Sequence, residues 1–368
     1  MKVLHIISSL ETGGAQKLVG DLLPIMNKFP KIEASVAVFH LTNSHIESSL
    51  KLNGVNIINL DCIAKSPKAI FKLIHIIKKY DIIHAHLFPI NYLVAIANIF
   101  TRKPIIFTEH STHNRRRNYP ILRPIEKLIY SAYSKIGCIS NATANSLSNW
   151  IGEKIALHRI EIIENGIDLK IFQEEPKQTS EKVFGRFGIP LIMVSRFTES
   201  KDHPTVLHAL KFINRKDVFV VFVGNGERRN EIENLALSLG LKEQVLFLGN
   251  RNDIPTLIKA SKIGIQSSNW EGFGLTAIEM MAGGIPVIAS DVDGLKQIVE
   301  GAGITFKKGD DKALASAINK LIEFPAFSEN IINQEKHRIE RYCISETATK
   351  YIHTYTILMN QSLKKYRQ

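Results

Sequence analysis

Residues 269–284 read NWEGFGLTAIEMMAGG, and this stretch decides the fold. It follows a short apolar run, Ile263–Gln266, that predicts a buried strand, and it leads into residues with helical spacing. Glycines at positions 272 and 274 let backbone N–H groups come close to a ligand, and the start of a helix carries positive partial charge. A strand, a glycine-rich turn and a helix in this order favour an α/β domain with a diphosphate near the turn.

Strand and helix patterns alternate on both sides of this segment. Continuous apolar strands between amphipathic helices predict parallel sheets that are covered on both faces. Helical stretches are predicted at Ala15–Asn27 and Lys68–Lys79, among others. The predicted strands are Val3–Ile7, Ser35–Phe39, Val55–Asn59, Ile82–His84, Ile105–Thr108, Leu191–Val194, Phe219–Val223, Val245–Leu248, Ile263–Gln266 and Pro286–Ala289.

The series of strands stops and restarts near the middle of the chain. A polar stretch, Gln173–Lys182, separates the two series, and a length of 368 residues fits two domains. We predict a first domain over residues 1–165, a second over 166–344 and a basic helix over 345–368. Because ligands of open α/β sheets bind at the carboxyl ends of the strands, we expect the residues that follow the strands to carry the function.

Two cations follow the first strand of the second series. Ser195-Arg196-Phe197 comes directly after this strand, and Lys201 lies five residues beyond Arg196. Fixed cations would stabilise the charge that develops on a departing diphosphate without a metal ion. Taken alone, an arginine and a lysine in a solvated loop are the commoner interpretation.

Two carboxylates accompany the glycine-rich turn. Glu271 lies in the turn, and Glu279 lies about one and a half turns into the helix. A carboxylate at the second position would accept two hydrogen bonds from a ribose. The alternative is a strand–turn–helix unit with surface glutamates.

Further glycine-rich loops follow strands in both halves. Gly13-Gly14 comes after the first strand, and Gly224-Asn225-Gly226 takes the same place in the second half. Each is either an approach loop for a phosphate or sugar, or a tight turn. The full GxGxxG pattern is absent and no acidic residue ends the second strand, which disfavours a dinucleotide-dependent enzyme.

The first half of the chain is strongly basic. Residues 1–165 contain 20 basic and 11 acidic residues, and the whole chain carries a net charge of +12. This favours an anionic partner, although no helix-turn-helix, zinc or aromatic RNA-binding pattern supports nucleic acid. Arg115-Arg116-Arg117 would meet an anionic membrane surface or the phosphates of a lipid-linked acceptor, or it forms a solvated loop.

Targeting and metal signals are weak. Met1–Leu10 is too short for a signal peptide, and no segment reaches the roughly 20 apolar residues of a membrane span. The three cysteines are far apart, which favours a reducing cytosol.

Asp291-Val292-Asp293 matches the Asp-x-Asp pattern of metal-dependent transferases, and His84-Ala85-His86 could be a metal pair, but neither has the expected sequence context. We therefore expect no metal ion or cofactor, and a cytoplasmic protein whose membrane contact, if any, is peripheral.

Together these motifs resemble glycosyltransferase family 4, which has the GT-B fold. The pair Glu271 and Glu279, with Gly-Phe-Gly-Leu between them, is similar to the hallmark of that family, and the other loops fall in the family's order. Two further segments also fall in the family's order: Thr108-Glu109-His110 after a strand, and Asn165-Gly166-Ile167-Asp168 at the domain junction. The resemblance implies two Rossmann-like α/β domains that face a cleft. It also implies an acceptor-binding first domain, a nucleotide-sugar-binding second domain and a C-terminal helix that crosses back to the first.

The resemblance also implies residue roles. Arg196 and Lys201 would hold the donor diphosphate, and Glu271 would bind the transferred sugar. Glu279 would bind the ribose, and His110 would face the transferred sugar near the reacting carbon. The other donor-binding residues would be Gly14, Gly224, Gly272, Phe273, Gly274, Leu275 and Thr276.

The implied activity is retaining, metal-independent transfer of a hexose. The donor would be a UDP-sugar rather than a GDP-sugar, and the acceptor a glycan or lipid-linked sugar of a surface polysaccharide or glycoconjugate. Another type of GT-B enzyme and a non-catalytic nucleotide-sugar-binding or partner-stabilising protein remain as alternatives. The sequence departs from the family pattern in one segment, which reads Asp293-Gly294-Leu295-Lys296-Gln297 where the family often has Gly-Gly-x-x-Glu. This departure leaves the identity of the transferred sugar undetermined.

Overall fold

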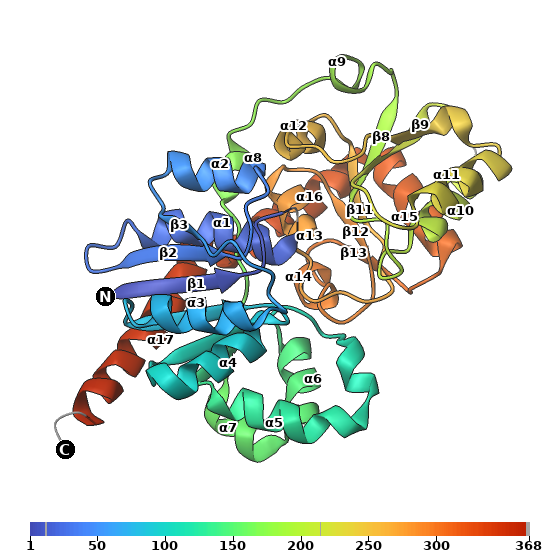
Figure 1. Cartoon of the computed structure of the whole chain (residues 1–368). Helices are drawn as coiled ribbons and strands as arrows, with labels where there is room; N and C mark the ends of the chain where they lie inside the picture. The colour runs from blue at the N-terminus through green and yellow to red at the C-terminus, as the bar shows by residue number, and fades with distance from the viewer. Residues whose placement is uncertain (12, 214, 366–368) are drawn as a thin grey trace. The chain divides into compact units, whose positions relative to one another are not determined.

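The chain folds into two α/β units, each built on one parallel sheet, which confirms the predicted fold class (Figure 1). The computed structural model describes residues 1–11, 13–213 and 215–365. The first unit comprises residues 1–166 together with 344–368, and the second comprises Ile167–Cys343. The chain therefore leaves the first unit once and returns to it at its C-terminal helix.

The first sheet has the strand order β3-β2-β1-β4-β5-β6-β7, and every neighbouring pair is parallel. His5 of β1 lies opposite His84 of β4 in the register of this sheet. The strands are β1 (Lys2–Ile7), β2 (Glu33–Val38), β3 (Ile57–Asn59), β4 (Ile82–His86), β5 (Ile105–Glu109), β6 (Lys135–Cys138) and β7 (Ile160–Ile162).

Helices cover both faces of the first sheet because alternate residues of its strands are apolar on each side. Val3 and Ile7 pack in a core with α1, α2 and α17, whereas Leu4 and Ile6 pack in a second core with α3, α4 and α6. The helices of this unit are α1 (Gly14–Met26), α2 (His45–Leu52), α3 (Pro67–Ile77), α4 (Ile90–Thr101), η1 (Arg115–Asn118), η2 (Pro120–Leu122), α5 (Arg123–Ala132), α6 (Asn141–Ile151), α7 (Glu153–Arg159) and α17 (Ile344–Lys365).

The second sheet has the order β10-β9-β8-β11-β12-β13 and is also parallel. Its strands are β8 (Ile189–Val194), β9 (Val218–Val223), β10 (Val245–Phe247), β11 (Ile263–Gln266), β12 (Val287–Ser290) and β13 (Ile304–Phe306). Its helices are α8 (Leu169–Gln173), α9 (Ser180–Phe184), α10 (His203–Ile213), α11 (Arg229–Ser238), η3 (Lys242–Gln244), α12 (Ile254–Lys259), α13 (Leu275–Ala282), α14 (Lys296–Val299), α15 (Asp311–Glu323), α16 (Pro325–Ile339) and η4 (Glu340–Tyr342).

All ten predicted strands are present, and β6, β7 and β13 are additional. The three are short, and the apolar run of β6 is interrupted by Gly137, so none gave a clear pattern. The stretch predicted as a polar linker, residues 173–182, contains the last residue of α8 and the start of α9.

The C-terminal helix packs on the first unit, as predicted. Its residues Tyr351 and Tyr355 are fully buried in the core shared with α1. Thr347 Oγ1 donates to the Glu164 carbonyl at 2.9 Å, which fixes the start of the helix. Residues 366–368 of the predicted helix lie outside the described residues.

The strand order reverses direction at one point in each sheet. In the first sheet this point lies between β1 and β4, and in the second between β8 and β11. Ligands of open α/β sheets bind outside the carboxyl ends of the strands at such a point. In the second unit, the loops that meet this condition hold Arg196, Lys201 and Glu271.

Candidate functional site

The loops after β8 and β11 lie side by side in the second unit. Lys201 and Ser268 form an antiparallel bridge between the two loops. The backbone N–H of Asn269 donates to the Ser200 carbonyl at 2.9 Å. These backbone contacts fix the loops to one another at the point where the strand order reverses.

Lys201 and Glu271 form an ion pair between these loops. Lys201 Nζ also donates to the Ser268 hydroxyl at 3.4 Å, and Glu271 Oε1 accepts from the Gly272 amide at 3.0 Å. The two charged side chains are 15% and 19% exposed, so each is partly shielded from water and still accessible. The structure thus brings together two of the predicted site residues, one from each loop.

Helix α13 begins at the predicted glycine-rich turn. Gly274 is its N-cap residue and has a φ of 96°, which glycine adopts without a Cβ clash. A Cβ atom at Gly294 would lie 2.5 Å from the Glu271 carbonyl oxygen, so the 293–297 loop packs directly on the backbone at Glu271. The segment that departs from the family pattern therefore lies against a predicted sugar-binding residue.

Arg196 is exposed just after the end of β8, and the residue that follows it, Phe197, is buried. Phe197 stacks on the His203 ring, with 4.2 Å between ring centroids. Gly224 has a φ of 133°, and a Cβ there would lie 2.0 Å from the Ser195 carbonyl oxygen. No described residue pairs with the Arg196 guanidinium, so this cation is available to an anion.

The remaining predicted residues lie along the turn and α13. Phe273 is 2% exposed and meets Tyr342 edge-on, so it supports the turn from inside. Glu279 is 4% exposed, and Thr276 Oγ1 donates to Gln266 Oε1 at 2.9 Å. The half-buried members of the set are Gly224, Gly272, Leu275 and Thr276.

The Asp-x-Asp pattern and the departing loop have local partners. Asp291 forms an ion pair with Lys296 at 3.1 Å, and Asp293 is exposed. Gln297 Nε2 is buried and has no hydrogen-bond partner among the described residues. A ligand that reached this amide donor would supply the hydrogen-bond acceptor that it lacks.

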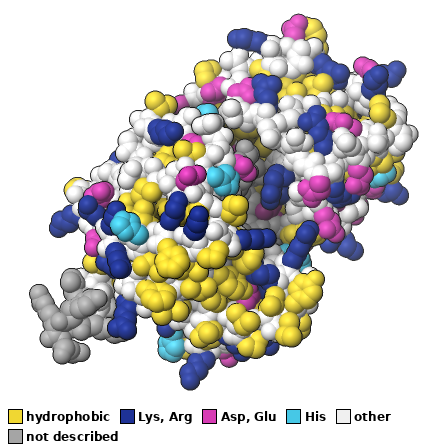
Figure 2. All heavy atoms as spheres, viewed as in Figure 1, with side chains coloured by type: hydrophobic (Ala, Val, Ile, Leu, Met, Phe, Trp, Pro, Cys, Tyr) yellow, Lys and Arg dark blue, Asp and Glu magenta, His cyan; other side chains and the backbone are white. Residues whose placement is uncertain are grey.

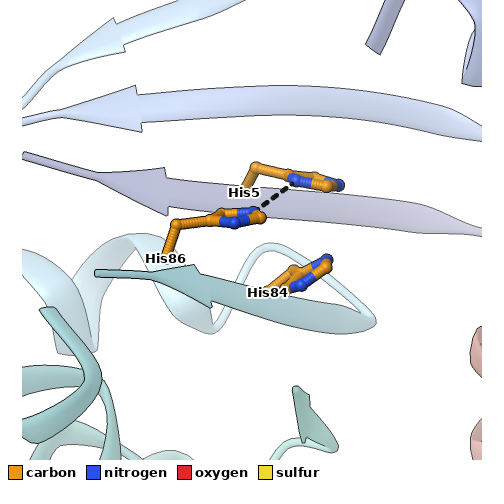
Figure 3. Close-up of side chains that lie close together, drawn as sticks. All are labelled: His5, His84 and His86. Carbon is orange, nitrogen blue, oxygen red and sulfur yellow. Dashed lines mark hydrogen bonds between the residues drawn. The ribbon is translucent and has the colours of Figure 1, made fainter. Parts of the chain in front are cut away.

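Three histidines lie together in the core of the first unit (Figure 3). His5 comes from β1, and His84 and His86 come from β4. Their ligand atoms lie within 4.8 Å of one another, close enough to hold a metal ion. The sequence offered only the pair on β4 without a further ligand at the expected spacing, and the fold corrects this by adding His5 of β1 as a third histidine.

Every ring nitrogen of these three histidines already has a hydrogen-bond partner. His5 Nδ1 meets His86 Nε2 at 3.0 Å, and His5 Nε2 meets Tyr355 Oη at 3.3 Å. His84 meets Tyr355 Oη and Thr108 Oγ1, each at 2.7 Å. A metal ion would have to displace this network, so we assign the cluster as a hydrogen-bonded core.

The network reaches the predicted residue His110. His86 Nδ1 and His110 Nε2 are 3.1 Å apart, and no described residue bonds to His110 Nδ1. Burial lowers the pKa of His5 and of His110 to about 3. Burial, together with the neighbouring histidines, holds the pKa of His84 and His86 well below the ordinary value. All four imidazoles are therefore neutral at pH 7.

The three consecutive arginines do not act as one exposed patch. Arg116 pairs with buried Glu126 at 2.7 Å, and Arg117 pairs with Glu109 at 2.8 Å. Only Arg115 of the three is exposed. Two of the predicted membrane cations are therefore held inside the first unit, because each neutralises a buried carboxylate.

Two family models match the chain, one in each unit. The model described as Glycosyltransferase Family 4 matches residues 13–171, and the model described as Glycosyl transferases group 1 matches residues 178–338. Together they take in most of the chain. The chain belongs to glycosyltransferase family 4.

Known proteins similar to this glycosyltransferase include characterised transferases. A UDP-Gal:alpha-D-GlcNAc-diphosphoundecaprenol alpha-1,3-galactosyltransferase of Escherichia coli is 28% identical over 64% of this chain and 65% of its own length. A phosphatidyl-myo-inositol mannosyltransferase of Mycobacterium leprae is 25% identical over 77% and 75%. The structure of Anabaena HepE in complex with UDP-glucose has a TM-score of 0.86 at 23% identity and covers 97% of this chain and 99% of that chain, which confirms the GT-B fold.

Sequence reasoning missed several residues of this glycosyltransferase that shape the two regions. His5, Tyr351 and Tyr355 are apart from His84 in the sequence, and only the sheet and α17 bring them together. Alternating histidines on one strand were a usable signal for two of the three clustered histidines, His84 and His86. Ser268 lies next to the quoted segment, and its contact with Lys201 depends on the strand order.

Proposed function

We propose that this glycosyltransferase moves a hexose from a UDP-sugar to a lipid-linked or glycan acceptor, with retention and without a metal ion. The observation that carries the proposal is the pair Lys201 and Glu271, a cation and a carboxylate fixed beside a glycine-rich turn and a helix N-terminus. A diphosphate needs the first, and sugar hydroxyls need the second. Arg196 adds a second accessible cation at the end of β8.

The choice of UDP rests on the relatives. The Escherichia coli relative is named for UDP-Gal, and the HepE structure contains UDP-glucose. Transfer without metal is supported by the two cations, which would balance the charge on the leaving diphosphate. In this proposal Asp291 takes no part in metal binding, because its carboxylate is paired with Lys296.

Retention follows from the family resemblance and requires a same-face transfer. A double displacement would need a free carboxylate nucleophile beside the sugar. Glu109, next to His110, is held by Arg117 and by the Tyr130 hydroxyl. We therefore propose that the leaving phosphate helps to deprotonate the acceptor. The anomeric proton of the first product, observed by NMR, tests this: an inverted product contradicts it.

A melting-temperature panel of UDP- and GDP-sugars without added metal tests the donor. At about ten times Kd, a ligand of the native state adds about 1.4 kcal/mol, or roughly 3–6 °C for a domain of this size. We expect such a shift with at least one UDP-sugar and with UDP. Added EDTA should leave the shift unchanged.

Two results would contradict the donor assignment. A shift with GDP-sugars alone would replace UDP by GDP. No shift with any nucleotide sugar, from a cooperatively melting sample, would favour the non-catalytic alternative. Lys308→Ala, an exposed lysine of the second unit, is the matched control for the Lys201→Ala variant in the same panel.

We further propose that the first unit docks peripherally on the cytoplasmic face of an anionic membrane, where a lipid-linked acceptor would be presented. Figure 2 shows hydrophobic side chains gathered over α4 and α5, two helices that pack together. The exposed fractions are 68% for Ile99 and 65% for Phe100 on α4, and 55% for Ile125 and 71% for Leu128 on α5. Exposed Arg115 lies on the neighbouring segment η1. No described helix is long and apolar enough to cross a membrane.

Sedimentation with vesicles of phosphatidylglycerol and phosphatidylcholine tests this docking. The double variant Ile125→Asp/Leu128→Asp should lower the bound fraction at least about tenfold, since each side chain loses its apolar burial in the lipid and gains a charge. Leu237→Asp, at a half-exposed position in the second unit, is the control. Equal binding of the double variant and the control would refute the docking surface.

A further inference from the structure

A chain of hydrogen bonds runs through the core of the first unit and ends at His110. It begins at Tyr351 on α17, whose hydroxyl lies 2.8 Å from Thr108 Oγ1. From Thr108 it passes to His84 and then to Tyr355. It continues through the rings shown in Figure 3 and reaches His110 from His86. Six hydrogen bonds connect seven side chains.

Each of the seven side chains has one proton to donate. A neutral imidazole has one N–H and one lone pair on nitrogen, and a hydroxyl has one proton and accepting lone pairs. Since the low pKa values keep the four imidazoles neutral, seven protons are available for six hydrogen bonds. One proton must therefore point out of the chain, at one end or the other.

The two ends differ in what they can do with that proton. Tyr351 is fully buried, and among the described residues Thr108 is the one hydrogen-bond partner of its hydroxyl. A proton pointing away from Thr108 would be a buried donor with no acceptor, which is costly. His110 is half-buried, and no described residue bonds to its Nδ1. The spare proton therefore belongs on His110.

The direction of every bond follows from this. Tyr351 donates to Thr108, which donates to His84 Nε2. His84 donates through Nδ1 to Tyr355, and Tyr355 donates to His5 Nε2. His5 and His86 then donate through Nδ1 to the next ring. All four histidines are Nδ1–H tautomers in this arrangement.

We propose that this chain fixes His110 as a neutral Nδ1–H donor to a hydroxyl oxygen of the sugar substrate. His110 then serves as a hydrogen-bond donor in sugar binding and does not act as the general base. Tyr351, Thr108 and His86 are positioning residues, because they act through His110. The part that concerns the sugar rests on the proposed glycosyltransferase activity, whereas the direction of the chain does not.

Ring-¹⁵N NMR of the full chain, labelled at histidine, tests the direction. His→Gln variants at positions 5, 84, 86 and 110 assign the signals. We expect the Nδ1–H pattern in all four rings, in excess by about tenfold or more, and no protonation between pH 6 and 8. An Nε2–H pattern at His110 or His86 would overturn the proposal.

Tyr351→Phe separates this role from a structural one. The variant removes the proton that sets the direction, so the excess of Nδ1–H should fall about tenfold in all four rings together. Tyr133→Phe is the matched control, since Tyr133 is an equally buried tyrosine whose hydroxyl donates to the Asn91 carbonyl outside the chain. If both variants leave the tautomers unchanged, the buried tyrosine does not set the direction and the proposal fails.

The proposed contact between His110 and the sugar substrate is tested separately, by the His110 ring-¹⁵N signal. Adding UDP-glucose or UDP-galactose should shift the His110 Nδ1–H signal, whereas UDP alone should not, because it lacks the hydroxyls of the transferred hexose. If a UDP-sugar raises the melting temperature but leaves the His110 signal in place, the role of His110 is refuted while the proposed function stands. If no nucleotide sugar binds, the proposed function fails, and with it the substrate of His110. The tautomers would still report on the chain.

Discussion

Lys201→Ala is expected to lower kcat/KM for sugar transfer by about 10³-fold, with melting temperature within a few degrees of the parent. The ammonium would stabilise the charge on the leaving diphosphate, and removing one such fixed group typically costs two to three orders of magnitude. Lys201 is 15% exposed, so its charge acts in a partly shielded site rather than in free solvent. Initial rates with the best UDP-sugar from the donor panel provide the measurement.

Glu271→Ala is the partner variant in the same experiment. Because Lys201 and Glu271 form an ion pair, each single substitution removes this one interaction from both side chains. We therefore expect the double variant to be no slower than about the slower single variant, a non-additive result typical of residues that act as a unit. Additive losses would mean that the two side chains act independently.

Lys308→Ala is the control for this series because Lys308 is an exposed lysine of the same unit. It should retain parental kcat/KM. Parental activity in both Lys201→Ala and Glu271→Ala would contradict the site assignment, even if transfer itself is observed. A loss that is matched by unfolding would instead indicate a structural role, which circular dichroism distinguishes.

The first unit is expected to lose stability between pH 7 and about pH 5 more steeply than the second. Burial lowers the pKa of His5 to about 3, and that of His84 and His86 well below the usual value. The unfolded chain therefore binds protons at these rings below about pH 6.5 while the folded state does not. The free energy of unfolding falls as pH falls, by about 2 kcal/mol for each fully buried ring between pH 7 and 5.

One carboxyl in the same unit has the opposite effect on stability, because it favours the folded state as the pH falls. Burial raises the pKa of Glu109, against the opposing effect of Arg117, so the folded state takes up a proton there first. That single group offsets part of the effect of the histidines. The second unit has one comparable histidine, His203, whose pKa burial lowers to about 4. Burial also raises the pKa of Glu335 in the second unit well above its usual value, which offsets the effect of His203 there. Four histidines of lowered pKa against one such carboxyl in the first unit, and one against one in the second, should make the two units differ by about three protons in the slope of stability against pH.

The two tryptophans allow the units to be followed separately. Trp150 lies in the first unit and Trp270 in the second, so Trp270→Phe and Trp150→Phe each report on one unit. Urea unfolding at a series of pH values gives the proton number from the slope. His86→Gln should lower that number by about one in the first unit, and His75→Gln, at an exposed position on α3, should not. A slope below one proton for the first unit would contradict the prediction.

The sequence alone determined the fold class and the glycine-rich turn of the candidate site. Apolar strands between amphipathic helices predicted two parallel sheets, since this pattern is read from neighbouring residues. The glycine-rich turn before α13 was readable for the same reason, because backbone approach to a ligand depends on local residue type. The predicted roles of Arg196, Lys201, Glu271, Glu279 and His110 remain predictions.

Tertiary structure alone decided which of these residues meet. The order β8-β11 places Lys201 against Ser268 and Glu271, and no local pattern encodes that neighbour relation. The return of α17 places Tyr351 and Tyr355 against Thr108 and His84. A sequence of alternating histidines shows which side chains share a face, but hydrogen-bond partners and burial depend on segments that are distant in the chain. For that reason the neutral chain that ends at His110 was visible only in the folded molecule.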